Sequence, residues 1–178
     1  MPGGGQRLRR RKFLELSAAA ATAAGLSSCG RSGGGPYWRF FSASEAAAVT
    51  AICARIIPAD DYPSAAEAGV PRFLDRQLVG HYRKHQEAYR QGLRAVEEAS
   101  RARHQKSFAA LSEEEQDEIL REIEEKQAEF FGMIRNHIMQ GYYGDPRHGG
   151  NREALSWKML GLPNPPVRGR LPYERRSA

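Results

Sequence analysis

Two histidines stand at a spacing that could hold a metal ion. His81 and His85 are four residues apart, which on a helix places both imidazoles on one face, as in paired zinc ligands. The metalloprotease version of this pair also needs a glutamate after the first histidine, and Tyr82 stands there instead. Arg83 and Lys84 lie between the histidines and disfavour a further cation. We therefore predict a solvated helix face and no metal site.

Asp60 and Asp61 are adjacent carboxylates, a residue type that serves in general acid–base catalysis. Adjacent residues point in different directions, and both aspartates follow a predicted helix in a loop that contains Pro58 and Pro63. Such positions favour capping of the loop backbone by the side chains. We therefore predict no catalytic, cofactor-binding or metal-binding residue in this chain.

Residues 141–151 form the most unusual stretch of the sequence, Gly-Tyr-Tyr-Gly-Asp-Pro-Arg-His-Gly-Gly-Asn. The stretch is no dinucleotide-binding fingerprint, because no strand precedes it and its glycines are spaced differently. It is no phosphate-binding loop either, because it lacks Gly-Lys followed by Ser or Thr. Two tyrosines and an arginine between turn residues make a rigid, amphipathic surface, a composition found at protein interfaces.

We predict that this loop contacts a protein partner. The residues assigned to the interface are Tyr142, Tyr143, Asp145, Arg147 and Asn151. The alternative is a purely structural turn region that fills the core of the domain with its two tyrosines and Trp157.

The N-terminal segment 1–28 has the order of a secretory signal peptide: a basic region, a short apolar region and small residues. As a helix, the apolar stretch 16–26 would span about 16 Å. A bilayer core is about 30 Å thick, so this stretch is too short to cross it. The segment is therefore expected to direct export.

Part of this leader resembles the twin-arginine export motif, through Arg10, Arg11, Phe13 and Leu14. Arg9 replaces the usual hydroxyl residue and Glu15 the frequent lysine. Such signals are recognised by a receptor of the export pathway. The twin-arginine translocase moves folded proteins, so a cargo can cross already loaded with cofactor or bound to a partner. The alternatives are an ordinary secretory leader or a basic disordered arm.

Cys29 ends the sequence Leu-Ser-Ser-Cys, which looks like a lipobox, the site where a cysteine is acylated and becomes the mature N-terminus. A Ser-Gly-Gly-Gly spacer at 32–35 suits a flexible tether. We predict a lipid anchor at Cys29 that holds the protein at the periplasmic face of the bacterial inner membrane. The alternative is cleavage at a nearby small-residue site, which leaves Cys29 a free thiol.

Two capping boxes, Ser42 with Glu45 and Ser112 with Glu115, mark the starts of helices. The first helix is expected to end at Pro58, and a short helix 71–78 to open with proline. A longer polar helix is predicted over 82–104. The apolar stripe 130–138 continues the helix after Ser112 or follows a break near residue 125, and residue 141, a glycine, is placed to end it.

No segment alternates as a strand between hairpin turns, so the predicted fold class is all-α. We expect a single compact helical domain of about five helices after the signal peptide. The domain covers 42–163, follows a flexible tether at 29–41, and precedes an irregular, Gly/Pro-rich, extended or disordered tail at 164–178.

The net charge of +6 might suggest nucleic acid, but its location does not. Five bases lie in the leader, and four arginines lie beyond Val167. The body between them is close to neutral, whereas a nucleic-acid-binding domain needs a basic face on its folded part. We therefore expect no nucleic-acid partner.

Nearly the whole body, 42–163, resembles the gluconate 2-dehydrogenase subunit 3 family. The resemblance is strongest over 130–162, and weaker around Ile56-Ile57-Pro58-Ala59-Asp60 and Ala68-Gly69-Val70-Pro71. Within 130–162 it rests on Phe130-Phe131, His137 to Gly141, Tyr143 to Arg147, Gly149-Gly150-Asn151 and Trp157 to Gly161. His148 stands where the family pattern leads us to expect a tyrosine.

This resemblance implies a non-catalytic small subunit of a membrane-bound, flavin-dependent sugar or sugar-acid dehydrogenase. In such complexes the large subunit carries FAD and the chemistry, and a cytochrome c subunit with haem c often takes the electrons. The large subunit typically lacks its own signal and is exported with the small one. The alternatives are a stand-alone periplasmic enzyme using the histidine or aspartate pair, and a lipoprotein chaperone for an unrelated partner.

Overall fold

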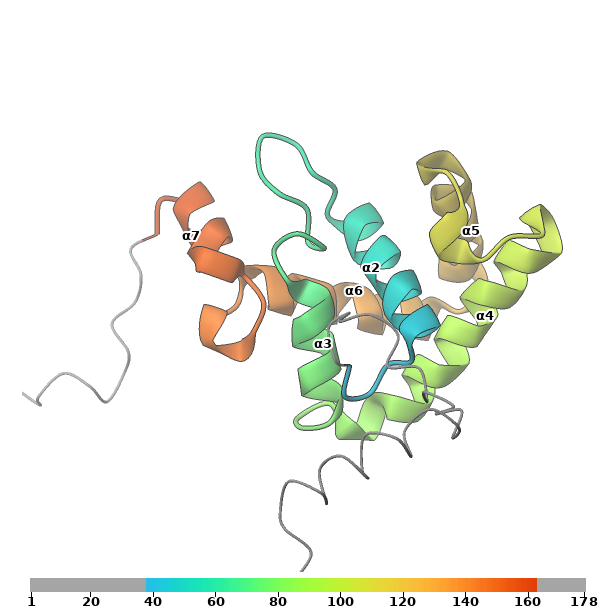
Figure 1. Cartoon of the computed structure of the whole chain (residues 1–178), viewed down its shortest axis with the longest axis horizontal. Helices are drawn as coiled ribbons and strands as arrows, with labels where there is room; N and C mark the ends of the chain where they lie inside the picture. Colours follow the sequence, from blue (N-terminus) through green and yellow to red (C-terminus); the bar gives the residue numbers. More distant parts are fainter. Residues whose placement is uncertain (1–37, 163–178) are drawn as a thin grey trace, which may run out of the picture. The chain divides into compact units, whose positions relative to one another are not determined.

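The computed structural model describes residues 38–162, and these residues contain helices and no strands. The all-α class is therefore confirmed for this part of the chain. These residues form six α-helices, with short 3₁₀ turns between some of them (Figure 1). They are α2 (Ala43–Ile56), α3 (Val70–Leu78), α4 (Gln86–His104), α5 (Glu113–Lys126), α6 (Ala128–Tyr143) and α7 (Leu155–Met159). No helix in 38–162 is long and apolar enough to cross a membrane.

Both predicted capping boxes are present. Ser42 and Ser112 accept hydrogen bonds from the backbone N–H groups of Glu45 and Glu115, and each glutamate accepts one from the N–H of its serine. Such a cap stabilises a helix by about 1 kcal/mol. The starts of α2 and α5 are therefore fixed by residues that lie within four positions of each other.

The break that separates α5 from α6 lies at Gln127, whose φ of −134° leaves the helical region. Because of this break, α6 can cross the other helices: it contacts α2, α3, α4 and α5 and passes behind α2 and α3 in Figure 1. The core lies along these contacts. Its most deeply buried large aliphatic side chains are Val49, Ile52, Val70, Leu74, Leu78, Val96, Ile119, Ile134 and Ile138. Each contributes about 2 kcal/mol through burial.

Gly141 does not end α6 as predicted. The helix continues to Tyr143, and Gly144 follows it as the C-cap. A β-carbon on Gly141 would lie 2.7 Å from the ring of Phe73 and 3.0 Å from Val70. Gly141 is therefore required by the close approach of α3 to α6.

The predicted long helix 82–104 begins later than expected. A 3₁₀ turn, η2 (Arg83–His85), precedes α4, and Tyr82 lies outside both elements. The sixth helix, α7, is the element missing from the five that the sequence predicts.

Residues 39–41, which the sequence assigns to the end of the flexible tether, are bound to α3. The carboxylate of Asp75 in α3 accepts hydrogen bonds from three consecutive backbone N–H groups, those of Arg39 (2.8 Å), Phe40 (2.9 Å) and Phe41 (3.1 Å). Asp75 is only 1% exposed. Its negative charge is thus stabilised by charge-assisted hydrogen bonds, and it attaches the start of the domain to α3. The predicted leader, Cys29 and the tail 164–178 lie outside the described residues.

Candidate functional site

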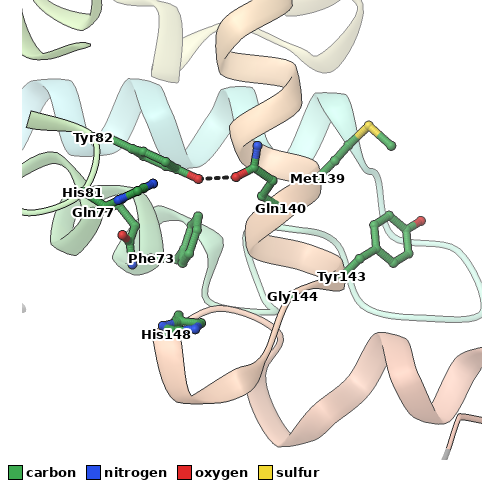
Figure 2. Close-up of a pocket in the computed structure, with 9 residues that line it drawn as sticks. All are labelled: Phe73, Gln77, His81, Tyr82, Met139, Gln140, Tyr143, Gly144 and His148. Atoms are coloured by element: carbon green, nitrogen blue, oxygen red, sulfur yellow. Dashed lines mark hydrogen bonds between the residues drawn. The ribbon is translucent and has the colours of Figure 1, made fainter. Parts of the chain in front are cut away.

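A groove with a volume of about 860 Å³ is formed by segments that are far apart in the sequence (Figure 2). It is formed by α3, the turn before η2, the C-terminal half of α6 and the 3₁₀ turn η4 (Pro146–His148). The residues that line it are Phe73, Gln77, His81, Tyr82, Met139, Gln140, Tyr143, Gly144 and His148. Sequence reasoning did not identify this groove.

One flank of the groove is apolar and exposed. Met139 and Tyr143 extend from one side of α6, one helical turn apart, and are 45% and 39% exposed (Figure 2). Phe73 is buried and packs edge-to-face on the ring of Tyr82, with 6.0 Å between the ring centroids. The Tyr82 hydroxyl donates a hydrogen bond to Oε1 of Gln140, which joins the turn before η2 to α6.

The chain after α6 folds back onto the end of that helix. The buried Asn151 donates from Nδ2 to the carbonyl of Gly144 (2.8 Å) and accepts at Oδ1 from the N–H of Ser156 (2.9 Å). Trp157 donates from Nε1 to the carbonyl of Tyr143 (2.8 Å). Two side chains thereby bind carbonyl groups at the end of α6, which the helix itself cannot pair.

Gly150 makes this fold-back sterically feasible. A β-carbon on Gly150 would lie 2.2 Å from the carbonyl oxygen of Gly141, well inside any tolerated contact. Gly149 has a φ of +102°, a conformation that side chains rarely adopt. The loop therefore lies directly on the backbone of α6.

The structure separates the five residues assigned to a partner interface. Tyr142 is 2% exposed and donates its hydroxyl hydrogen to the carbonyl of Pro63 (2.9 Å), and Asn151 is fully buried. Both residues are buried with their polar atoms satisfied within the domain, which the structural alternative expected of Tyr142. Tyr143 is exposed in the groove. Its contact with a partner stays a prediction.

Asp145 and Arg147 form a local pair on the surface. Asp145 accepts hydrogen bonds from the backbone N–H and from Nε of Arg147, both at 2.9 Å. These bonds lower the pKa of Asp145 to about 2. The Arg147 side chain is 57% exposed, so the pair leaves the outer part of the guanidinium accessible to another molecule.

The histidine and aspartate pairs lie in turns and loops. His81 lies in a turn and His85 ends η2, so the two do not share a helix face. Asp60 accepts a hydrogen bond at Oδ1 from the N–H of Tyr62 (2.8 Å), which is the predicted loop capping. Within 38–162, no three potential metal-ligating side chains lie close enough to hold an ion.

His137 is a buried titratable group that the sequence showed only as part of an apolar stripe. Its ring lies between those of Tyr82 (centroids 3.9 Å apart) and Tyr89 (6.0 Å), and its Nδ1 is 3.1 Å from the Tyr89 hydroxyl. Burial and the neighbouring His85 lower the pKa of His137 to about 4. The imidazole is therefore neutral near pH 7 and joins α6 to α4 as part of a ring stack.

Comparison with known proteins identifies the family. The model of the family described as Gluconate 2-dehydrogenase subunit 3 matches residues 43–163, which include every helix described above. Comparison with curated proteins and with solved structures finds no match. Because the match spans more than half of the sequence and the whole helical body, this chain belongs to the gluconate 2-dehydrogenase subunit 3 family.

Proposed function

We propose that this chain is the non-catalytic small subunit of a flavin-dependent gluconate or sugar dehydrogenase complex. Its role is to support export by the twin-arginine route, maturation and stability of the subunit that carries FAD. The observation that carries this proposal is the family match over 43–163 in a chain whose first 28 residues read as an export signal. A cytochrome c subunit with haem c is a further expected partner.

The lining of the groove supports a binding role. The groove residues with titratable side chains are His81, His148 and two tyrosines, and no carboxylate lines the groove beside them. General acid–base catalysis normally needs a proton donor and acceptor held at a common reacting atom. The exposed apolar flank and the rigid loop instead favour a contact surface.

The export role is tested by replacing Arg10 and Arg11 with lysine. The body does not contain these residues, so it should fold normally while the double variant and its flavoprotein stay in the cytoplasm. Cell fractionation followed by flavin absorbance measures both proteins. Normal export of the pair would contradict the twin-arginine assignment.

The lipid anchor is tested on the mature protein. Mass spectrometry should find an N-terminal peptide that begins with acylated Cys29. An internal, unmodified Cys29 would refute the anchor without affecting the subunit assignment. A single acyl chain binds a membrane only marginally, so a stable anchor requires more than one chain.

The non-catalytic role is tested on the isolated chain. We expect it to bind no FAD and to oxidise no sugar, since all flavin should elute with the large subunit. Stoichiometric flavin in the purified small subunit would overturn this part of the proposal.

A further inference from the structure

We propose that the groove between α3 and α6 binds a segment of the flavoprotein subunit that presents apolar side chains next to carboxylates. This inference rests on the proposed function and deepens it, because it assigns the contact to one surface and gives the chemistry of the occupant. The groove brings together an apolar flank and a basic rim.

The exposed apolar flank would be complemented by apolar side chains on the partner. Met139 and Tyr143 are two of the large hydrophobic residues that stay exposed in 38–162, and both line the groove. Tyrosine is enriched at the energetic centres of interfaces, and methionine adapts its shape to a docked surface. The buried Phe73 lines the α3 side of the same groove.

The basic rim, formed by Arg76, Arg83 and Lys84, would be complemented by carboxylates on the partner. Arg76, Arg83 and Lys84 are exposed, and none of them pairs with a carboxylate of residues 38–162. Arg76 lies beside the groove: it precedes the lining residue Gln77, and a β-carbon on Gly149, which follows the lining residue His148, would come within 2.8 Å of its Nη1 atom. The other two bases follow Tyr82 directly in η2. Unpaired charges at the rim of an interface steer a partner of opposite charge.

The chain's own termini do not suit this site. Residues 1–37 and 163–178 are both rich in arginine and contain few acids. Their positive charge would meet the positive rim of the groove. The occupant is therefore expected to be acidic and to come from another chain.

The groove wall is built to dock with little loss of conformational entropy. Asn151 and Trp157 bind the carbonyl groups of Gly144 and Tyr143, and Gly150 lies against Gly141. A preorganised loop loses less freedom on binding than a flexible one. Tyr143 is thus presented on a backbone that is already fixed.

The test uses the full chain and the flavoprotein that copurifies with it from the native host, identified by its flavin absorbance. Met139→Asp places a charge on the apolar flank and should weaken binding by about tenfold or more. Arg76→Glu reverses the rim charge and should lower the association rate, with an effect that shrinks as salt is added. Biolayer interferometry measures both quantities.

Two matched controls carry the same changes elsewhere. Leu160→Asp alters an apolar residue that is 54% exposed outside the groove, and Arg94→Glu alters a base on α4 whose side chain is 63% exposed. Both should bind the flavoprotein within about twofold of the unmodified chain. Circular dichroism verifies folding. Arg76→Glu decides the question if Met139→Asp lowers the melting temperature, because the Arg76 side chain is exposed.

The outcomes separate this inference from the proposed function. An unmodified chain that captures no flavoprotein overturns both. Capture that survives Met139→Asp and Arg76→Glu overturns the groove and leaves the subunit role intact. A chain that dimerises alone, or that binds phosphatidylglycerol vesicles, and loses this property in Met139→Asp assigns the groove to a second copy or to the membrane and overturns the partner proposed here.

Discussion

The two ends of the helical domain differ in how their surface charges are neutralised. At the ion-paired end, where α4 and α5 meet Arg55 of α2, most acids have a basic partner in the same chain. Arg103, for example, contacts both Glu118 and Glu122. At the groove end, formed by α3, the C-terminal half of α6 and residues 144–157, Arg147 pairs with Asp145. The exposed base Arg76 has no carboxylate partner among the described residues, and the apolar side chains of Met139 and Tyr143 are exposed.

This difference supports the proposal that the partner binds at the groove end. Exposed ion pairs satisfy each other and leave little to gain from a partner. An exposed apolar flank beside unpaired bases gains free energy when a complementary surface covers it. We also expect the two ends to respond differently to substitution, because the groove end contains buried single contacts such as those of Asp75, whereas the ion-paired end has several exposed ion pairs.

The largest expected effect is at Asp75. Asp75→Ala leaves three buried or half-buried N–H groups without an acceptor and should lower the free energy of unfolding by about 4 kcal/mol. Urea titration followed by circular dichroism measures this loss. The control is Arg147→Ala at the same end, whose loss should be far smaller because its ion pair is exposed to solvent. Equal losses in the two variants would break the distinction between buried and exposed contacts.

The second prediction concerns His137, through which the stability of the groove end should depend on pH. Its pKa is about 4 in the folded chain and ordinarily 6.5, so the unfolded state binds the proton first as the pH falls. The folded state should therefore lose about 3 kcal/mol between pH 7 and pH 4 from this one group. His137→Phe should remove that part of the pH dependence. An unchanged slope of stability against pH in the variant would show that the pKa of His137 is not lowered in the folded chain.

Gly150 tests how rigidly the loop lies on α6. Gly150→Ala would bring a methyl group within 2.2 Å of the Gly141 carbonyl oxygen, so the backbone must move, at a cost of about 2 kcal/mol. Gly132→Ala is the control, since no atom lies within 4 Å of the added β-carbon. It should be neutral or slightly stabilising. A Gly150 variant as stable as the control would mean that the loop can lift off the helix.

The smallest effect is expected at the ion-paired end. Asp117 accepts hydrogen bonds from Nε (2.8 Å) and Nη2 (2.9 Å) of Arg55, which lower the pKa of Asp117 below its ordinary 3.8. A lowered carboxylate pKa stabilises the fold above pH 3.8, and that contribution disappears as the pH falls below it. Asp117→Asn should therefore cost less than about 1 kcal/mol at pH 7 and nothing in acid. A larger loss would show that the ion pairs at this end are not interchangeable.

Local patterns predicted the fold where the deciding contacts lie close in sequence. Ser42 and Ser112 mark helix starts because each bonds a glutamate three residues on. Gly141 was misassigned as a helix end because its reason, the ring of Phe73, lies on another helix. The five-residue α7 follows an alanine in the left-handed region and has too short a periodic pattern to be recognised.

The groove could not be predicted from the sequence for the same physical reason. Its flanks, near Phe73 and near Met139, are far apart in the sequence and meet only through tertiary packing. The loop composition did indicate an unusual surface. It did not reveal that adjacent tyrosines face opposite environments, with Tyr142 inside and Tyr143 outside.

The attachment of residues 39–41 to Asp75 also has a mechanical consequence. A pulling force applied to the chain before Trp38 reaches the folded body through three hydrogen bonds on one carboxylate. Those bonds share the load and direct it into α3, the centre of the groove end, before it reaches the first turn of α2. A force on the N-terminal side of Trp38 is thus resisted by three hydrogen bonds loaded in parallel, and it does not unfold α2 one turn at a time.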